Sequence, residues 1–125
     1  MTRPELTQQV TFLHTTNLTE TAVFYQMILG LKLVLDQGTC QIFQVNGEAF
    51  IGFCEHFQGA NPDSVILTLV SDQVDAWHDY LIANNVPIEK SPTFNETFNI
   101  YHIFLRDPNG YLIEIQKFLD PSWPN

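Results

Sequence analysis

His102 and Glu114 are the two residues whose types and spacing point most directly to chemistry. Both lie in an apolar stretch, Ile100–Gln116, in which two β-branched and aromatic runs flank the sequence DPNG at 107–110. Pro, Asn and Gly in that order predict a tight turn, so the stretch is typical of a β-hairpin. A carboxylate among Tyr, Leu and Ile side chains is costly to bury without a partner. A histidine beside it could transfer protons, with the carboxylate setting the tautomer and orientation of the imidazole.

The elements that must position this hairpin repeat along the chain. Alternating and helical hydrophobic patterns predict the same order of strand, helix and three strands twice. The first half is predicted as strand Gln9–His14, a helix between Asn17 and Gly30, and strands Leu31–Asp36, Cys40–Val45 and Ala49–Cys54. The second half is predicted as strand Ser64–Val70, a helix capped by Ser71 or Asp72, strand Pro87–Lys90, a loop over 91–99, and strands Ile100–Arg106 and Tyr111–Lys117. We therefore expect one domain over residues 1–125, with module one at about 8–57 and module two at about 64–118.

The composition excludes several classes of partner. Five basic and fourteen acidic residues give a net charge of −9, which repels nucleic acid and anionic membranes. The N-terminal residues lack the apolar core of a signal peptide and no stretch is long enough to span a membrane, so we expect a cytoplasmic protein. Cys40 and Cys54 lie in apolar strands, and in that compartment we expect buried free thiols rather than a disulfide.

The motifs together resemble a known family. Phe24-Tyr25 and Leu29-Gly30, followed by DPNG and Glu114, are similar to the vicinal oxygen chelate superfamily, the glyoxalase, bleomycin-resistance and extradiol dioxygenase group, over residues 8 to 118. The resemblance implies an α+β fold of two βαβββ modules that form a cupped, incompletely closed mixed sheet around one cavity. It also implies a homodimer and a small-molecule ligand. In many members a divalent metal chelates two neighbouring oxygens of the substrate, whereas other members only bind and sequester a drug.

The ligand positions that the resemblance implies are mostly aliphatic in this chain. They fall on Val10, Ile51, Ile66 and Glu114, of which only Glu114 can coordinate a metal. We therefore expect no metal and no other cofactor. A divalent metal held by a displaced set, His14, His102 and Glu114, is the alternative. A third possibility is that these are polar groups of a ligand pocket that perform no chemistry.

Other residues are candidates for ligand binding. The resemblance places Phe12 and Phe104 in the cavity, together with His14 and His102. Phe94 and Asn99 lie in a loop that could close over a ligand, and Tyr101 could donate a phenolic hydrogen bond.

The register of the hairpin decides which of these residues meet. If Arg106 pairs with Tyr111, alternation places Ile103 on the face of Glu114, whereas the resemblance places His102 there.

Two functions of different class follow. One is a small-molecule-binding protein that either sequesters its ligand or acts as a metal-independent lyase or isomerase through Glu114, His102 and His14. The alternative is a metal-dependent lyase or isomerase that uses the displaced site. The chain has five Lys and Arg residues, so a site with several cationic groups for the carboxylates of glutathione is hard to build.

Overall fold

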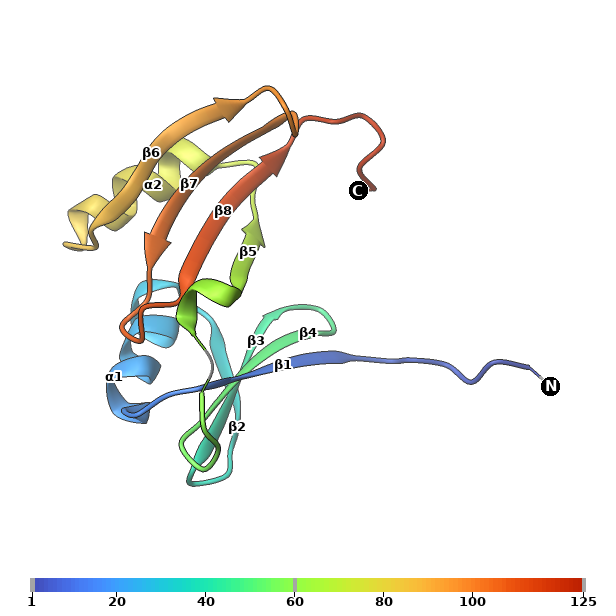
Figure 1. Ribbon diagram of the computed structural model, residues 1–125, viewed down its shortest axis with the longest axis vertical. Coiled ribbons are helices and arrows are strands. Elements are labelled where there is room, and N and C mark those ends of the chain that lie inside the picture. Colours follow the sequence, from blue (N-terminus) through green and yellow to red (C-terminus); the bar gives the residue numbers. More distant parts are fainter. Residues whose placement is uncertain (1, 60, 125) are drawn as a thin grey trace. The chain divides into compact units, whose positions relative to one another are not determined.

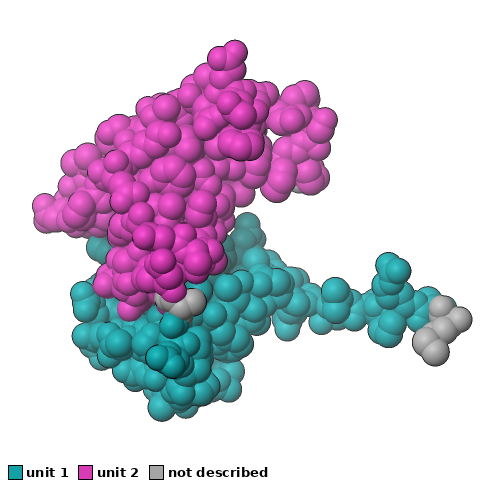
Figure 2. Space-filling model, viewed as in Figure 1, with its two compact units in different colours: residues 1–60 teal, residues 61–125 magenta. Residues whose placement is uncertain are grey.

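The chain is divided into two compact units, residues 1–60 and 61–125 (Figure 2). The computed structural model describes residues 2–59 and 61–124. Each unit contains one mixed four-stranded sheet, and in each the first strand is followed by a helix (Figure 1). The α+β class and the βαβββ order predicted from the sequence are confirmed. In the described part of the chain, no helix has the length and apolar character needed to cross a membrane.

The elements follow the predicted order with small shifts at their ends. Unit one comprises β1 (Gln9–His14), α1 (Leu18–Ala22), the π-helical segment η1 (Val23–Ile28), β2 (Lys32–Asp36), β3 (Cys40–Asn46) and β4 (Ala49–Cys54). Unit two comprises the 3₁₀ turn η2 (Pro62–Ser64), β5 (Ile66–Val70), α2 (Val74–Ala83), β6 (Ile88–Asn95), β7 (Ile100–Arg106) and β8 (Leu112–Phe118).

Both sheets have the same topology. The strand orders are β1-β4-β3-β2 and β5-β8-β7-β6. In each sheet the first strand runs parallel to the last, and the other neighbours are antiparallel. A connection through a helix is what allows the first strand to pair in parallel with a later one.

Helix α1 begins where the sequence predicts. The Asn17 side chain accepts a hydrogen bond from the amide of Glu20 at 3.0 Å, as an N-cap residue does. The helix then widens, because the amide of Leu29 donates to the carbonyl of Phe24, five residues back, at 3.0 Å. Gly30 ends it with φ of 75°, a conformation that favours glycine.

The core of each unit lies between its sheet and its helix. In unit one the ring of Tyr25 contacts Phe43 and Phe53, with centroids 5.9 and 4.6 Å apart, and all three side chains are buried. In unit two Leu81 of α2 and Ile103 of β7 are fully buried. Burial of each such side chain contributes about 2 kcal/mol.

Three expectations are corrected by the structure. Strand β6 continues to Asn95, because Thr93 and Phe94 pair with β7 where we expected a loop. Helix α2 has Gln73 as its N-cap residue, with no side-chain cap. Cys40 and Cys54 form a disulfide, not two free thiols, because they are register partners on adjacent strands with Cα atoms 4.1 Å apart.

Candidate functional site

The face of the unit-two sheet that lies opposite α2, called the open face below, carries two of the candidate catalytic residues, His102 and Glu114. In this sheet Phe104 pairs with Glu114, and Glu114 pairs with Thr68. Directly paired residues share a face and alternate residues follow them, so His102 lies on the same face. The register conflict is thereby resolved in favour of His102.

The reason for this register is the length of the turn. Arg106 pairs with Leu112 rather than with Tyr111. The Asp107 carboxylate accepts hydrogen bonds from the amides of Asn109 and Tyr111 at 2.9 and 2.8 Å, and the Asp107 amide donates to the Tyr111 carbonyl at 3.0 Å. Asp107 and Tyr111 therefore belong to the turn, and the parity of the hairpin shifts by one residue.

A buried hydrogen-bond network surrounds Glu114. Nδ1 of His102 lies 2.6 Å from Oε2 of Glu114, and the Thr68 hydroxyl donates to Oε1 at 3.0 Å. The Gln116 amide, oriented with its nitrogen toward the carboxylate, donates to Oε2 at 2.7 Å and to Oε1 at 3.0 Å. His102 is 3% exposed and Glu114 8%. Three side chains thus offer donors to one carboxylate, which compensates for its burial.

Nε2 of His102 is the exception in this network. It is buried and has no hydrogen-bond partner among the described residues. An unpaired buried polar atom costs about 1 to 3 kcal/mol, and a catalytic role is one explanation for keeping it. The ring of Phe104 stands edge-on to the imidazole with centroids 5.0 Å apart, and the ammonium of Lys90 lies 5.8 Å from the Phe104 centroid.

The candidate ligand-binding residues Tyr101, Phe94 and Asn99 lie outside the network around Glu114. Tyr101 faces α2, where its hydroxyl donates to Asp75 at 2.5 Å, and this hydrogen bond raises the pKa of the Tyr101 phenol. Phe94 pairs with Tyr101 and so shares that face, opposite His102. Asn99 lies at the turn that precedes β7, with φ of 53°.

Two members of the network were missed by sequence reasoning. Gln116 lies two residues after Glu114 in the same strand, so the two-residue alternation of a strand would have placed it on the same face. Thr68 has no comparable signal, because its position depends on the parallel pairing of β5 with β8.

The candidates of unit one lie on the open face of its own sheet. Phe12 pairs with Gly52, and two carbons of its ring lie 2.5 Å from where a Cβ at Gly52 would be. His14 is half-buried at the end of β1. The backbone of Gly59 lies against the imidazole, since a Cβ there would come within 2.8 Å of Nδ1.

Comparison with known proteins agrees with this architecture. The sequence profile of the Glyoxalase/Bleomycin resistance protein/Dioxygenase superfamily matches residues 7–115. The chain belongs to this superfamily. No curated protein sequence is similar enough to match the chain.

Several solved structures share the fold at low sequence identity. A lactoylglutathione lyase from Agrobacterium tumefaciens is 20% identical with a TM-score of 0.76, over 97% of this chain and 100% of that one. A glyoxalase/bleomycin resistance protein/dioxygenase from Nocardioides is 17% identical with a TM-score of 0.77, over 100% of this chain and 90% of that one. A virulence protein from Salmonella typhimurium is 21% identical with a TM-score of 0.73, over 95% and 100%. These similarities establish the fold.

The metal that many superfamily members bind does not fit the side chains at its expected positions. Val10 and Ile66 are aliphatic. Ile51, another of the expected ligand positions, is a buried residue that pairs with Phe43 on the helix-covered face, so it faces the core of unit one. Ile51 and Glu114 each lie four residues after the turn glycine of their hairpin, but they lie on different faces of their sheets because the hairpin between β3 and β4 is shorter than the one after β7. Phe50 and Gly52, which flank Ile51 and lie on the open face, have no side-chain atom that could bind a metal either.

Proposed function

We propose that this superfamily member binds a small carbonyl compound and transfers a proton through His102 without a metal, as a lyase or isomerase. The observation that supports this function is the buried contact of 2.6 Å between His102 Nδ1 and Glu114, together with the unpartnered Nε2. A buried histidine usually has a hydrogen-bond partner at both ring nitrogens. His102 has one at Nδ1, and among the described residues it has none at Nε2.

The arrangement defines the role of each group. When Nδ1 carries its proton and donates it to Glu114, Nε2 presents a lone pair and can accept a proton from a carbon next to a carbonyl. The carboxylate then stabilises the imidazolium that forms, as in other histidine–carboxylate pairs. Nε2–H returns the proton to a neighbouring carbon in an isomerisation, or to the leaving group in an elimination. Thr68 and Gln116 hold the carboxylate in place for these steps.

A ligand that reaches Nε2 must displace a neighbouring side chain, because the nitrogen is buried. We expect the half-buried ring of Phe104 to move, since it stands next to the imidazole and can also stack on an apolar part of the ligand. Lys90, beyond that ring, adds positive charge toward which an anionic group of the ligand would orient.

Glutathione does not fit this site well. The chain has five Lys and Arg residues. One of them, Arg106, already binds Glu89 and Asp63 at 3.0 and 2.7 Å, and these hydrogen bonds raise the pKa of its guanidinium. We therefore propose a substrate that is not a glutathione conjugate.

Exchange of carbon-bound hydrogen with D₂O, followed by proton NMR over a panel of small enolisable carbonyl compounds, tests the proposal without knowledge of the product. A compound that exchanges with the wild-type protein should exchange about 10²- to 10⁴-fold more slowly with His102→Gln. His78→Gln, which changes a partly buried histidine of α2 that contacts Asp79, should behave as the wild type. Treatment with a chelator should have no effect.

Three other outcomes contradict the proposal. Exchange that a chelator abolishes and Mn²⁺ restores would support the metal-dependent alternative. Saturable binding of a compound without exchange would indicate a sequestering protein. Exchange that persists in His102→Gln would assign the chemistry to another residue.

A further inference from the structure

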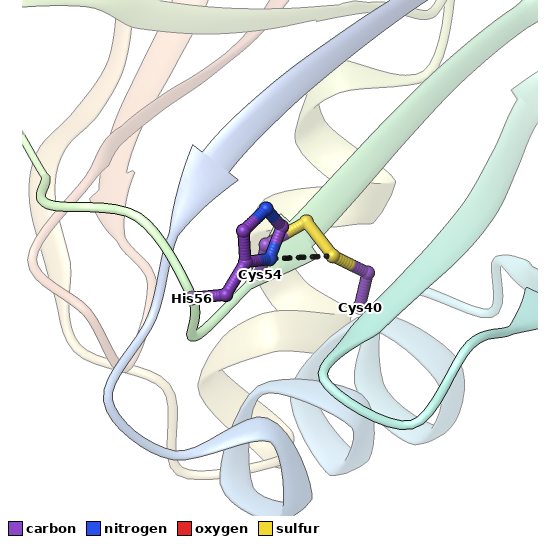
Figure 3. Close-up of side chains that lie close together, drawn as sticks. All are labelled: Cys40, Cys54 and His56. Carbon is purple, nitrogen blue, oxygen red and sulfur yellow. Dashed lines mark hydrogen bonds between the residues drawn. A yellow bond between two sulfur atoms is a disulfide. The ribbon is translucent and has the colours of Figure 1, made fainter.

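A second cluster of reactive side chains lies in unit one, apart from the residues of the proposed function. Cys40 begins β3 and Cys54 ends β4, where the two are register partners, and His56 follows in the loop (Figure 3). Nδ1 of His56 lies 3.2 Å from Sγ of Cys40. One ligand atom from each of the three residues lies within 4.8 Å of the other two.

This cluster borders a pocket that could admit a small molecule. The pocket has a volume of about 320 Å³ and is lined by Phe12, Gln37, Phe57 and the three residues of the cluster. The two cysteines are buried, whereas His56 is exposed. A volume of this size is at the lower end of the range for small-ligand sites, so a low-molecular-weight thiol can reach the sulfurs from the pocket.

Reduction of the disulfide by such a thiol is chemically balanced. A thiolate RS⁻ attacks Sγ of Cys54, the bond between the two sulfurs breaks, and Cys40 leaves as a thiolate beside His56. A second RSH then releases Cys54, which yields two protein thiols and one RSSR. The imidazole can pass a proton to the departing sulfur of Cys40, since the two atoms are already 3.2 Å apart.

We propose that the reduced cluster binds one Zn²⁺ through Cys40, Cys54 and His56, and that oxidation to the disulfide releases the ion. Two thiolates and one imidazole are a preferred donor set for zinc. In a tetrahedral zinc site, ligand atoms lie roughly 3.6 Å apart. The imidazole nitrogen lies 3.2 Å from Sγ of Cys40 and within 4.8 Å of Sγ of Cys54, whereas the two sulfurs are bonded to each other and must move apart after reduction.

The surroundings complete the site. The strand pairing fixes the two cysteine backbones with Cα atoms 4.1 Å apart, so after reduction only side-chain rotation is needed to separate the sulfurs. The pocket lies next to the cluster and leaves the fourth position to a water molecule. Binding of Zn²⁺ releases the two thiol protons, and oxidation by a small disulfide of the RSSR class reverses the sequence.

Titration of the whole chain with Zn²⁺ and Co²⁺ tests the inference. The protein is reduced with a phosphine, freed of reductant without air, and compared with the untreated disulfide form. We expect one Zn²⁺ per reduced chain and none per oxidised chain, together with Co²⁺ absorption bands typical of tetrahedral thiolate ligation. Addition of a small oxidised disulfide should release the ion, as measured with a chromogenic chelator.

Variants distinguish the three-ligand site from zinc binding elsewhere on the chain. His56→Ala changes an exposed residue and should weaken Zn²⁺ binding at least 10-fold, whereas His78→Ala in unit two should leave it unchanged. Cys40→Ser should abolish the cobalt bands, and far-UV circular dichroism of the same sample establishes whether it is folded. Equal Zn²⁺ affinity of His56→Ala and wild type, or of the oxidised and reduced chains, would overturn the inference. The result is independent of the proton-exchange assay, because His102 and Glu114 take no part in it.

Discussion

Replacement of Glu114 by Gln removes the charge at the centre of the unit-two network and keeps its shape. In the wild type the carboxylate accepts from Thr68 and His102 at 3.0 and 2.6 Å, and from Gln116 at both oxygens. The amide of the variant can accept at one of these positions only, and its nitrogen faces a donor at the other. The least costly arrangement turns this nitrogen toward Thr68, whose hydroxyl can accept instead.

The magnitude follows from these contacts. A hydrogen bond to a charged group contributes about 1.5 to 3 kcal/mol and a neutral one about 1 kcal/mol. Exchange of charge-assisted bonds for neutral ones at His102 and Thr68 therefore lowers the free energy of unfolding by about 2 kcal/mol. Glu96→Gln, at an exposed position between β6 and β7, is the matched control and should change the free energy of unfolding by less than about 0.5 kcal/mol.

Urea unfolding followed by tryptophan fluorescence measures this effect. Both tryptophans, Trp77 and Trp123, belong to unit two, so the signal reports on the unit that contains the network. If Glu114→Gln unfolds at the same urea concentration as Glu96→Gln, the carboxylate is not held as described, and the assignment of His102 as an oriented base loses its support. In the proton-exchange assay the same variant should slow exchange with a detectable substrate by about 10² or more.

Three further predictions concern the fold around the candidate sites. Reduction of the disulfide in the presence of a chelator should lower the free energy of unfolding by about 3 kcal/mol, the value expected for a loop closed over a sequence separation of 14. An unchanged urea midpoint after reduction would contradict the presence of this disulfide. Gly52→Ala should destabilise unit one by about 1 kcal/mol because its Cβ meets the ring of Phe12, and Phe12→Ala in the same chain should remove that penalty. Because the pKa of Tyr101 is raised, its hydrogen bond to Asp75 stabilises the folded state below the ordinary phenol pKa of about 10, and this stabilisation is lost as the pH rises further. Tyr101→Phe should therefore lose less stability than wild type between about pH 9 and pH 12, as measured by urea unfolding at each pH.

The sequence predicted the elements of the fold well because its signals are local. The strands Gln9–His14, Ala49–Cys54 and Ile100–Arg106 have the predicted ends, and Asn17 caps the first helix as expected. In each case the information lies within a few residues: alternation of apolar side chains, a capping side chain, or a turn sequence.

The candidate site was harder to predict because it depends on register. Whether His102 or Ile103 faces Glu114 is decided by one residue of turn length, which in turn depends on the Asp107 carboxylate binding the amide of Tyr111 at 2.8 Å. A motif that signals a turn does not state how many residues the turn contains.

The disulfide was not predicted because it, too, depends on strand register. Asn46 pairs with Ala49, but Gln44 pairs with Phe50, so a bulge at Val45 shifts the register between β3 and β4. Continuation of the first pairing without the bulge would set Cys40 opposite Glu55 rather than opposite Cys54. A bulge of one residue leaves little trace in a single sequence, and an expectation based on cellular compartment therefore gave free thiols.

The two units share a topology, but the open faces of their sheets carry different side chains. In unit two, Thr68 and its partner Glu114 place polar atoms in the middle of the sheet, whereas in unit one Phe12 and its partner Gly52 place a ring over a bare backbone. The reactive atoms of unit one lie instead at the strand end, at Cys54. The proposed proton-transfer site in one sheet and the proposed zinc site in the other share no residues, so oxidation or zinc loading of unit one should leave the exchange rate at His102 unchanged. Measurement of exchange on the oxidised, reduced and zinc-loaded chain decides this, and a rate that follows the redox state would show that the two sites are coupled.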